Sequence, residues 1–308
     1  MKKPKYFVSL HTADNDYQVA QAASAEQTAR KLGIDLELTY SDNDAVTQST
    51  QILKAVQSPP ESRPDAIVLE PISSIALPQV ARAACTAGVG WAVLNRAPDY
   101  LAQLRPAAKR PMFAISADHL EIGRIQGRQI AALLPQGGSI LYIEGPSRSS
   151  AAEQRTKGML ETKPANVHVL TTLKGEWTEQ SAQRAVRSWL KLATSQGANV
   201  NLVAAQDDSM ALGARKAFQE LGDQRERQRW LDLPFIGLDG QPATGQSWVR
   251  EGLLAATVFI PPNAGQAIEI FAHAFKAGTQ PPEHVLTKSH SVPAIESLAL
   301  KKTHSARR

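Results

Sequence analysis

The sequence predicts an α/β fold built from two doubly wound parallel-sheet lobes. Short apolar runs and amphipathic helical patterns alternate about ten times along the chain, with short polar connections between them. The clearest example covers residues 202–217, where an apolar run ends at Gln206, Asp207 and Asp208 and a helical pattern follows at once. For a chain of 308 residues, two sheets of about five or six strands are more common than one large sheet.

In the N-terminal half, apolar runs mark the strands and turn residues mark where elements end. Gly33 is expected to close the first helix in a left-handed conformation, and Pro71 ends the third strand directly after Glu70. The pair Asn95 and Arg96 follows the fourth strand. Strands are expected over 6–10, 34–40, 65–69, 91–94 and 112–116, and helices over 17–32, 44–56 and 75–87.

The same alternation continues in the C-terminal half. Asp118 is expected to cap the helix over 120–134, and a turn at Gly137 and Gly138 leads into the next strand. Strands are expected over 139–143, 167–173, 202–205, 235–238 and 255–260. Helices are expected over 150–161, 179–194, 245–251, after residue 208, and in a last long segment before residue 277. The tail after Val285 is expected to be irregular, with room for short strands.

Composition and motifs argue against several classes of function. The net charge of +5 is concentrated near the two ends, and no basic stripe with interleaved aromatic residues occurs, so no nucleic-acid partner is expected. Neither a Gly-x-Gly-x-x-Gly turn after the first strand nor a Gly-Lys-Ser/Thr loop is present. The sequence also lacks a Gly-x-Ser-x-Gly nucleophile motif, a Cys-His pair and a His-Glu-x-x-His metal motif, so we expect no cofactor, no metal and no catalysis. Cys85, the single cysteine, cannot form an intrachain disulfide.

The N-terminal residues carry no recognisable export signal. The apolar run after Pro4 has only the length of a strand, whereas a secretory signal needs an apolar stretch of about 7–15 residues and a cleavage site. No segment approaches the roughly 20 apolar residues of a membrane span, so no membrane insertion is expected. Two interpretations stay open: the protein works in the cytoplasm, or an upstream signal is absent from this sequence.

Polar residues at the carboxyl ends of parallel strands are expected to face a ligand crevice. After the strand over 202–205, Asp208 is expected to cap the next helix through its carboxylate. That assignment leaves Asp207 as the residue that faces outward toward a ligand. Asp207 and Glu153 could serve as the two catalytic carboxylates of a glycosidase, but no other motif supports an enzyme.

Five motifs follow one another at characteristic intervals along almost the whole chain. They are Ala-Arg-Lys-Leu-Gly-Ile at 29–34, Val-Leu-Asn-Arg at 93–96, Ser-Ala-Ala-Glu-Gln-Arg at 150–155, Gln-Asp-Asp-Ser-Met-Ala-Leu-Gly at 206–213 and Ile-Gly-Leu-Asp-Gly at 236–240. Together they resemble the ribose-type periplasmic sugar-binding proteins of bacterial ABC transporters, type I solute-binding proteins whose core is shared with LacI-type repressors. The resemblance implies an N-terminal lobe of residues 1–115 plus 261–285 and a C-terminal lobe of 116–260 plus 286–308. Three chain crossings would join them, and the lobes would close on a ligand held between them.

The resemblance also implies which side chains contact the ligand. They are His11, Asn15, Tyr17, Gln18, Asn95 and Arg96 in the N-terminal lobe, and Glu153, Trp177, Asp207 and Asp239 in the C-terminal lobe. Some of these positions depart from the family pattern. Asn95 stands where the family has an Asp, Glu153 where it commonly has an Arg, and Asp207 where it has an Asn.

These departures predict an acidic crevice. Glu153 and Asp207 add negative charge, Asp14 and Asp16 lie nearby in sequence, and Arg96 is the one cation assigned to the site. Each like-charge pair at roughly 4 Å costs about 4 kcal/mol at an effective dielectric constant of about 20. We therefore expect a neutral sugar or polyol, or an amino sugar, and expect phosphates to be disfavoured.

The leading interpretation is the substrate-binding component of an ABC sugar transporter. It would be a monomer in the periplasm or cell envelope, with a sugar-like ligand and an ABC permease as partners. One alternative is a cytoplasmic ligand-sensing module with the LacI-type core and no DNA-binding domain, which would pass its closed state to a sensor protein. A sugar-modifying enzyme is the second, less favoured alternative.

Overall fold

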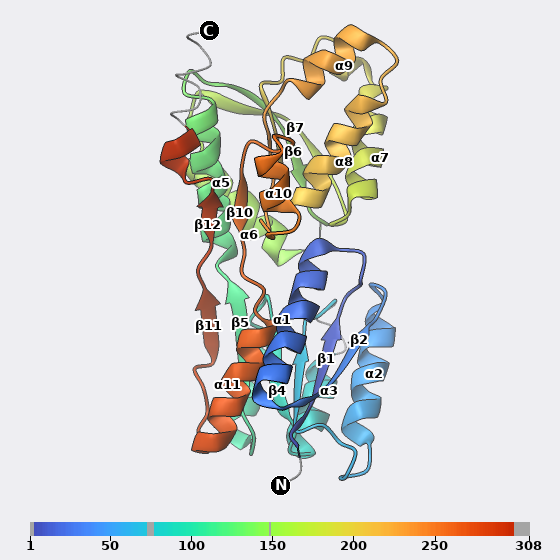
Figure 1. Cartoon of the computed structure of the whole chain (residues 1–308), viewed down its shortest axis with the longest axis vertical. Coiled ribbons are helices and arrows are strands. Elements are labelled where there is room, and N and C mark those ends of the chain that lie inside the picture. Colours follow the sequence, from blue (N-terminus) through green and yellow to red (C-terminus); the bar gives the residue numbers. More distant parts are fainter. Residues whose placement is uncertain (1–2, 73–76, 148, 299–308) are drawn as a thin grey trace. The chain divides into compact units, whose positions relative to one another are not determined.

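The computed structural model describes residues 3–72, 77–147 and 149–298, and these fall into two compact units (Figure 1). Unit 1 consists of Met1–Ala117 and Pro262–Thr287, and unit 2 of Asp118–Pro261 and Lys288–Arg308. The chain therefore passes from one unit to the other after Ala117, Pro261 and Thr287. Each unit is completed by a segment that comes late in the sequence.

Unit 1 contains a six-stranded sheet in the order β11-β5-β4-β3-β1-β2, and every neighbouring pair of strands is parallel. The strands are β1 (Lys5–Leu10), β2 (Asp35–Tyr40), β3 (Ala66–Leu69), β4 (Gly90–Leu94), β5 (Met112–Ala117) and β11 (His284–Thr287). In register, Tyr6 of β1 lies opposite Leu36 of β2 and Ala66 of β3. The next strand along the chain, β2, pairs with one side of β1, and β3 pairs with the other side. The order of strands in the sheet therefore reverses its direction at β1. The carboxyl ends of β1 and β3 thus form a topological switch point, where open parallel sheets bind ligands.

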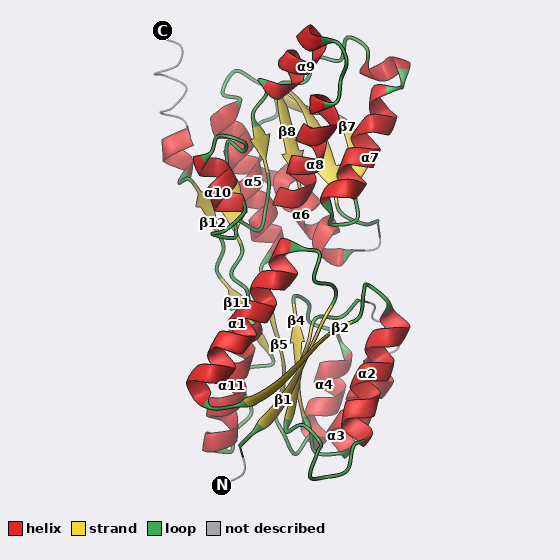
Figure 2. Cartoon of the chain, turned by 45° about the vertical axis from the view of Figure 1, so that its right-hand side comes forward, coloured by secondary structure: helices red, strands yellow, loops and turns green. Residues whose placement is uncertain are grey.

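Helices cover both faces of this sheet (Figure 2). The helices α1 (Asp16–Leu32) and α11 (Ala264–Ala277) pack on one face through a core that includes Tyr6, Phe113 and Phe271. On the other face lie α2 (Ala45–Gln57), α3 (Leu77–Thr86), α4 (Tyr100–Leu104) and the 3₁₀ turn η1 (Arg105–Ala107), around Trp91 and Ile52. Because both faces are covered, β3 and β4 are buried along their whole length and read as continuous apolar runs.

Unit 2 contains a four-stranded parallel sheet in the order β7-β6-β8-β9. Its strands are β6 (Gly138–Glu144), β7 (Val167–Lys174), β8 (Leu202–Ala205) and β9 (Phe235–Ile236). A separate antiparallel pair is formed by β10 (Thr257–Phe259) and β12 (His290–Val292). Since β6 lies between β7 and β8, this unit has its own switch point at the carboxyl ends of β6 and β8.

The sheet of unit 2 is also covered on both faces. The helices α5 (His119–Leu133) and α6 (Ser150–Thr162) pack on one face, and α7 (Glu179–Leu190) and α8 (Asp208–Gln219) pack on the other. The shorter helices are α9 (Gln224–Leu231), α10 (Gly245–Arg250) and the 3₁₀ turn η2 (Ala193–Ser195). A Cβ atom on Gly123 of α5 would lie 2.0 Å from the carbonyl oxygen of Arg155 in α6, so these two helices touch backbone to backbone.

The predicted fold class is confirmed: the protein is α/β with two parallel sheets, and the caps expected at Gly33 and Asp118 are present. The helix expected over 179–194 ends earlier, at Leu190. The helix expected over 75–87 is described only from Leu77, because its first two residues lie outside the described ranges. Sequence patterns missed α4 and α9, and α9 buries only Trp230, too little to give a helical apolar pattern. No described helix is both long and apolar enough to cross a bilayer.

Candidate functional site

In unit 1, the first strand-end loop is fixed by the start of helix α1. Asn15 caps the helix, its side-chain oxygen accepting from the backbone N–H groups of Tyr17 at 3.0 Å and Gln18 at 3.1 Å. The buried Gln18 accepts from the N–H of His11 at 2.9 Å and donates to Glu70 at 2.8 Å. Both ends of the Gln18 amide are therefore used inside the unit, where they hold the loop and Glu70 in place.

A second set of bonds orients the residues that follow β4. Asn95 has a positive φ of 60°, a conformation that asparagine tolerates better than most residues. Its side-chain oxygen accepts from Asn263 at 2.9 Å and from the Tyr17 hydroxyl at 3.3 Å. The buried Asn263 in turn accepts from Gln21 at 2.8 Å. Three sequence-predicted residues, Tyr17, Asn95 and Gln18, thus belong to a single polar network with Gln21 and Asn263.

Arg96 differs from its neighbours because it has no partner among the residues that the structure describes. It is half-buried directly after Asn95, and no described residue forms a hydrogen bond or ion pair with its guanidinium group. Burial lowers the pKa of Arg96, while the charges of Glu70 and Tyr100 act in the opposite direction. A guanidinium group stays charged in proteins and carries five N–H donors, and none of those of Arg96 bonds to a described residue.

In unit 2, Trp177 lies in the loop between β7 and α7 with a positive φ of 59°. A Cβ atom on Gly145 would lie 2.2 Å from the Trp177 ring, so only glycine allows the indole to lie against the loop after β6. The guanidinium carbon of Arg155 is 5.4 Å from the ring centroid, within the range of a cation–π contact. The half-buried indole is therefore held in place by its own unit.

Arg155 is a site residue that sequence reasoning missed. It is 7% exposed, donates to the backbone oxygen of Gln206 at 2.6 Å, and has a nitrogen 3.9 Å from the carboxylate of Asp239. Its spacing from the buried Ala152 and Met159, three and four residues away, is the helical signal that could have identified it. Glu153, which was predicted instead, is exposed on α6. Arg155 therefore places beside Asp239 a cation that the predicted set of site residues does not contain.

The cap expected at Asp208 is wrong, because Asp207 forms it instead. Asp207 is extended and caps α8, accepting from the N–H of Met210 at 2.5 Å, and it is only 2% exposed. Asp208 is the first helical residue, points into unit 2 and accepts from the N–H of Gly240 at 2.7 Å. The error arises because the helix starts one residue earlier than its apolar pattern does.

Acidic residues concentrate at the ends of β8 and β9. Asp239 has a positive φ of 95°, is 9% exposed and lies beside Arg155. Burial, the charge of Asp239 and, to a smaller extent, the charge of Asp207 raise the pKa of Asp208 well above its usual range. Hydrogen bonding to Gly240 offsets part of this shift. Asp208 therefore keeps its proton to higher pH than an exposed Asp does. No cluster of His, Cys, Asp or Glu within the described ranges could hold a metal ion.

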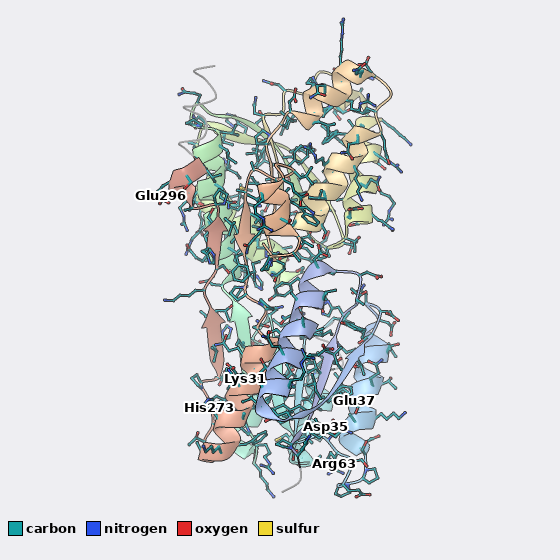
Figure 3. The ribbon with its side chains drawn as sticks, in the orientation of Figure 1. Lys31, Asp35, Glu37, Arg63, His273 and Glu296 are labelled. Atoms are coloured by element: carbon teal, nitrogen blue, oxygen red, sulfur yellow. The ribbon has the colours of Figure 1, made fainter. Side chains whose placement is uncertain are left out.

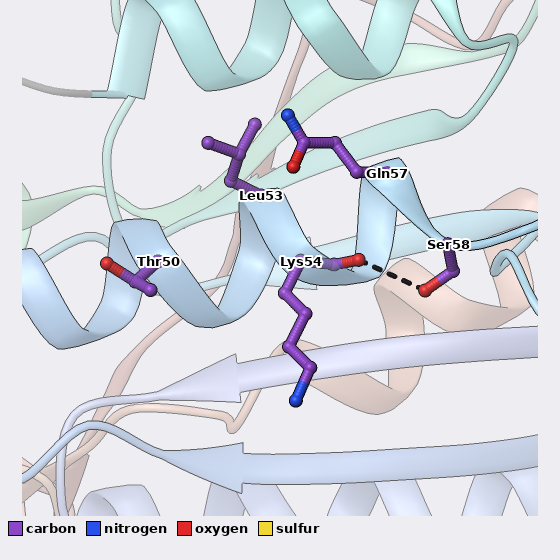
Figure 4. Close-up of a pocket in the computed structure, with 5 residues that line it drawn as sticks. All are labelled: Thr50, Leu53, Lys54, Gln57 and Ser58. Atoms are coloured by element: carbon purple, nitrogen blue, oxygen red, sulfur yellow. Dashed lines mark hydrogen bonds between the residues drawn. The ribbon is translucent and has the colours of Figure 1, made fainter.

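A hollow of about 550 Å³ lies beside α2, on the surface of unit 1 (Figure 4). It is lined by Thr50, Leu53, Lys54, Gln57 and Ser58, none of which was predicted as a site residue. The Ser58 hydroxyl donates to the backbone oxygen of Lys54 at 3.0 Å, which is a local bond at the end of the helix. The hollow brings together no charged pair and no strand end, so it is not the candidate site.

Comparison with known proteins identifies the class to which this arrangement belongs. Residues 6–278 match the family model described as a periplasmic binding protein domain, and the chain belongs to that family. The resemblance predicted from the five sequence motifs is therefore confirmed. Because the family and the relatives below are binding proteins, the prediction of a non-enzymatic protein is confirmed as well.

Among curated proteins, the chain is 27% identical to the ribose import binding protein RbsB of Salmonella typhimurium, over 84% of this chain and 79% of that one. It is 25% identical to the galactofuranose-binding protein YtfQ of Escherichia coli, over 90% of this chain and 84% of the other. Among solved structures, a solute-binding protein from Actinobacillus succinogenes with bound D-allose has a TM-score of 0.80 at 22% identity, covering 96% of this chain and 99% of that one. That likeness establishes a shared fold.

Proposed function

We propose that this protein captures a small hydroxyl-rich molecule, as the substrate-binding component of an ABC transporter. The observation that carries the proposal is Arg96, a half-buried guanidinium group at the end of β4 with no partner among the described residues. A sugar or polyol has many hydroxyl groups, each of which needs a partner once water is excluded. The relatives named above bind ribose, galactofuranose or D-allose by their descriptions, and all three ligands are of this class.

The ligand contacts that we propose come from both units. In unit 1 they are Arg96, Asn95, Tyr17, His11 and Asn15, with Gln18 as a supporting residue because its amide is already used. In unit 2 they are Trp177, Asp239 and Asp207, with Glu153 at the exposed edge. The indole of Trp177 offers an apolar face to the C–H groups of a sugar ring, and the carboxylates accept from its hydroxyls.

The mechanism that we propose is closure of one unit on the other around the ligand. The predicted lobes, 1–115 plus 261–285 and 116–260 plus 286–308, would be joined at three crossings that serve as the hinge. A ligand that contacts both units only in the closed state favours that state by the difference in contact energy. An ABC permease would recognise the closed monomer in the periplasm. The sensing alternative would use the same closure and a different partner.

A thermal-shift screen tests the proposal. The panel contains D-ribose, D-allose, xylitol, myo-inositol, amino sugars, nucleosides and sugar phosphates, and binding to the folded state raises the melting temperature. We expect at least one neutral sugar, polyol or amino sugar to stabilise the protein. Arg96→Ala should weaken that ligand about 10- to 100-fold, because hydrogen bonds to a charged group are lost.

The control is Arg82→Ala, which removes an exposed guanidinium from α3 in the same unit. It should bind as the unchanged protein does. The proposal fails if no member of the panel stabilises the protein, or if Arg96→Ala binds its ligand as tightly as Arg82→Ala. Turnover of the bound ligand would instead support the enzyme alternative.

A further inference from the structure

Gln206 directly follows β8 in unit 2 and was not among the residues predicted to contact a ligand. It is 0% exposed. Its backbone N–H donates to the oxygen of Ile143 in β6 at 2.9 Å, and its backbone oxygen accepts from the guanidinium group of Arg155 in α6 at 2.6 Å. The main chain of Gln206 therefore ties the end of β8 to both β6 and α6.

The side-chain amide of Gln206 adds further hydrogen bonds. Its oxygen Oε1 accepts at 2.9 Å from the backbone N–H of Gly145, which lies in the loop after β6. Its nitrogen Nε2 donates to the Tyr142 hydroxyl at 2.8 Å, and to the backbone oxygen of Ala152 and the Thr156 hydroxyl at 2.9 Å each. Because both ends of the buried amide are used inside the unit, Gln206 can affect a ligand only through its neighbours.

Two of these neighbours contact the indole of Trp177. A Cβ atom on Gly145 would lie 2.2 Å from the ring, so the main chain of that loop lies directly against the indole. The guanidinium carbon of Arg155 is 5.4 Å from the ring centroid. Trp177 itself has a φ of 59°, a strained conformation for a bulky residue, which persists only where the surrounding structure holds it. Gln206 is thus bonded to two groups that contact this residue.

The amide also holds the part of α6 that carries Arg155. Its acceptors Ala152 and Thr156 stand on either side of Arg155 in the sequence of that helix. An apolar side chain of similar size in place of Gln206 would leave the N–H of Gly145 without its acceptor. A buried polar group without a partner is costly, so the loop would have to shift to regain one. Such a shift would move the backbone that lies against the indole.

We propose that Gln206 is a positioning residue, which fixes the indole of Trp177 through the loop at Gly145 and the guanidinium group of Arg155. The inference rests on the proposed function, in which the indole covers the C–H groups of a sugar ring. An indole that is held in place before the ligand arrives loses less conformational entropy on binding. Gln206 therefore adds to the affinity without touching the ligand.

Gln206→Met tests the proposal, because methionine has a similar length and lacks the amide. The ligand is D-ribose, D-allose, xylitol or myo-inositol, whichever raises the melting temperature most, and affinities are measured by calorimetry at a temperature where every variant is folded. We expect Gln206→Met to weaken binding about 5- to 20-fold and Trp177→Ala to weaken it about 10- to 100-fold. In a protein that already carries Trp177→Ala, Gln206→Met should change the affinity by less than about twofold, because the two residues act as one unit.

The matched control is Gln129→Met, which removes a second fully buried amide from unit 2. Gln129 is 0% exposed and donates to the backbone oxygen of Thr257 at 2.8 Å and to the Ser291 hydroxyl at 2.9 Å. Both substitutions should lower the melting temperature, since each leaves buried polar groups without a partner. Only Gln206→Met should weaken the ligand, and Gln129→Met should bind within about twofold of the unchanged protein.

Gly145→Ala gives a second measurement that does not depend on the folding of Gln206→Met. Its Cβ atom would displace the indole directly while Gln206 stays in place. It should weaken the ligand by a factor similar to that of Gln206→Met, and it should have no further effect in the presence of Trp177→Ala. Unchanged affinity in Gly145→Ala would overturn the proposal.

Fluorescence of the ligand-free protein follows the indole itself. The emission of Trp177 is the difference between each protein and the same protein carrying Trp177→Phe. In Gln206→Met this emission should shift to longer wavelength and become more accessible to quenching by acrylamide, whereas in Gln129→Met it should stay unchanged.

The proposal fails if Gln206→Met leaves the Trp177 emission unchanged, or if its effect on affinity is equally large with and without Trp177. It also fails if Trp177→Ala binds the ligand as tightly as the unchanged protein does. Each of these results leaves ligand capture standing, because the unchanged protein still binds. If no member of the panel binds the unchanged protein, the proposed function fails, and the emission of Trp177 then decides whether Gln206 positions the indole.

Discussion

The carboxyl group of Asp208 occupies a space that glycines leave open. A Cβ atom on Gly237 would lie 2.2 Å from one of its oxygens, and one on Gly245 would lie 2.0 Å from the other. Gly240, with a positive φ of 56°, donates its N–H to the same carboxyl group. Asp208 therefore anchors the turn that carries Asp239, and a side chain at Gly237 or Gly245 would displace its carboxyl group.

The raised pKa of Asp208 makes the stability of unit 2 depend on pH. In the unfolded chain an Asp loses its proton near pH 4, at about 3.9. In the folded protein Asp208 keeps its proton to higher pH, because burial and the nearby charges of Asp239 and Asp207 disfavour the ionised form. The folded state then binds more protons than the unfolded state, so this contribution is fully present below about pH 4 and is lost as the pH rises through the folded pKa.

We expect Asp208→Asn to remove this dependence. Melting temperatures measured from about pH 4 to about pH 8 should fall less steeply with rising pH for this variant than for the unchanged protein. Asp35→Asn is the control, because Asp35 is an exposed residue of β2 (Figure 3). It should leave the slope unchanged. An unaltered slope in Asp208→Asn would contradict the assignment of a neutral buried carboxyl group.

At the scale of elements, the fold follows from local pattern more closely than the site does. Buried strands such as β3 and β8 are continuous apolar runs, and polar caps mark where helices begin, so strand and helix order are readable from sequence. The network that links Gln18, Glu70 and Asn263 joins residues far apart along the chain. No local spacing predicts such contacts, because they arise only after the strands are ordered in the sheet.

The backbone contact between α5 and α6 gives a prediction about packing. A Cβ atom on Gly158 of α6 would lie 2.0 Å from the backbone oxygen of Leu120 in α5, and backbone cannot move aside as a flexible side chain can. Gly158→Ala should therefore lower the free energy of unfolding by about 2–3 kcal/mol. Chemical denaturation measures this change.

Gly222→Ala is the control, since a Cβ atom there meets no heavy atom within 4 Å. It should change the free energy of unfolding by less than about 0.5 kcal/mol. An equal effect of the two substitutions would mean that α5 and α6 do not touch backbone to backbone.

At the scale of the whole molecule, each unit includes a segment from the last fifth of the sequence. The helix α11 supplies Phe271 to the core of unit 1, where its ring centroid is 4.9 Å from that of Phe113 and 5.8 Å from that of Tyr6. The strand β11 completes the same sheet by pairing with β5. Neither unit is a continuous stretch of sequence. A function that needs both units therefore requires almost the whole chain to be folded.

If a ligand contacts both units as proposed, the charges of each unit predict which ligands the protein rejects. In unit 1 the negative charge of Glu70 acts on Arg96. In unit 2 a nitrogen of Arg155 lies 3.9 Å from the carboxylate of Asp239, and Asp207 is a further buried acid. A ligand phosphate would meet these carboxylates without a surplus of cations, and each like-charge pair at roughly 4 Å costs about 4 kcal/mol at an effective dielectric constant of about 20. We expect a phosphorylated derivative of the best neutral ligand to bind at least about 100-fold more weakly than its parent.

Calorimetry with three forms of one ligand checks this expectation: the parent, its phosphate monoester, and its methyl ether at the same hydroxyl. The ether separates the loss of the hydroxyl and the added bulk from the added charge. If charge decides, the phosphate should bind more weakly than the ether, and the gap should narrow as salt is added, because screening weakens repulsion between partly exposed charges. A phosphate that binds as tightly as the parent would mean that the cations Arg96 and Arg155 dominate the site, and the ligand class would then have to be revised toward anions.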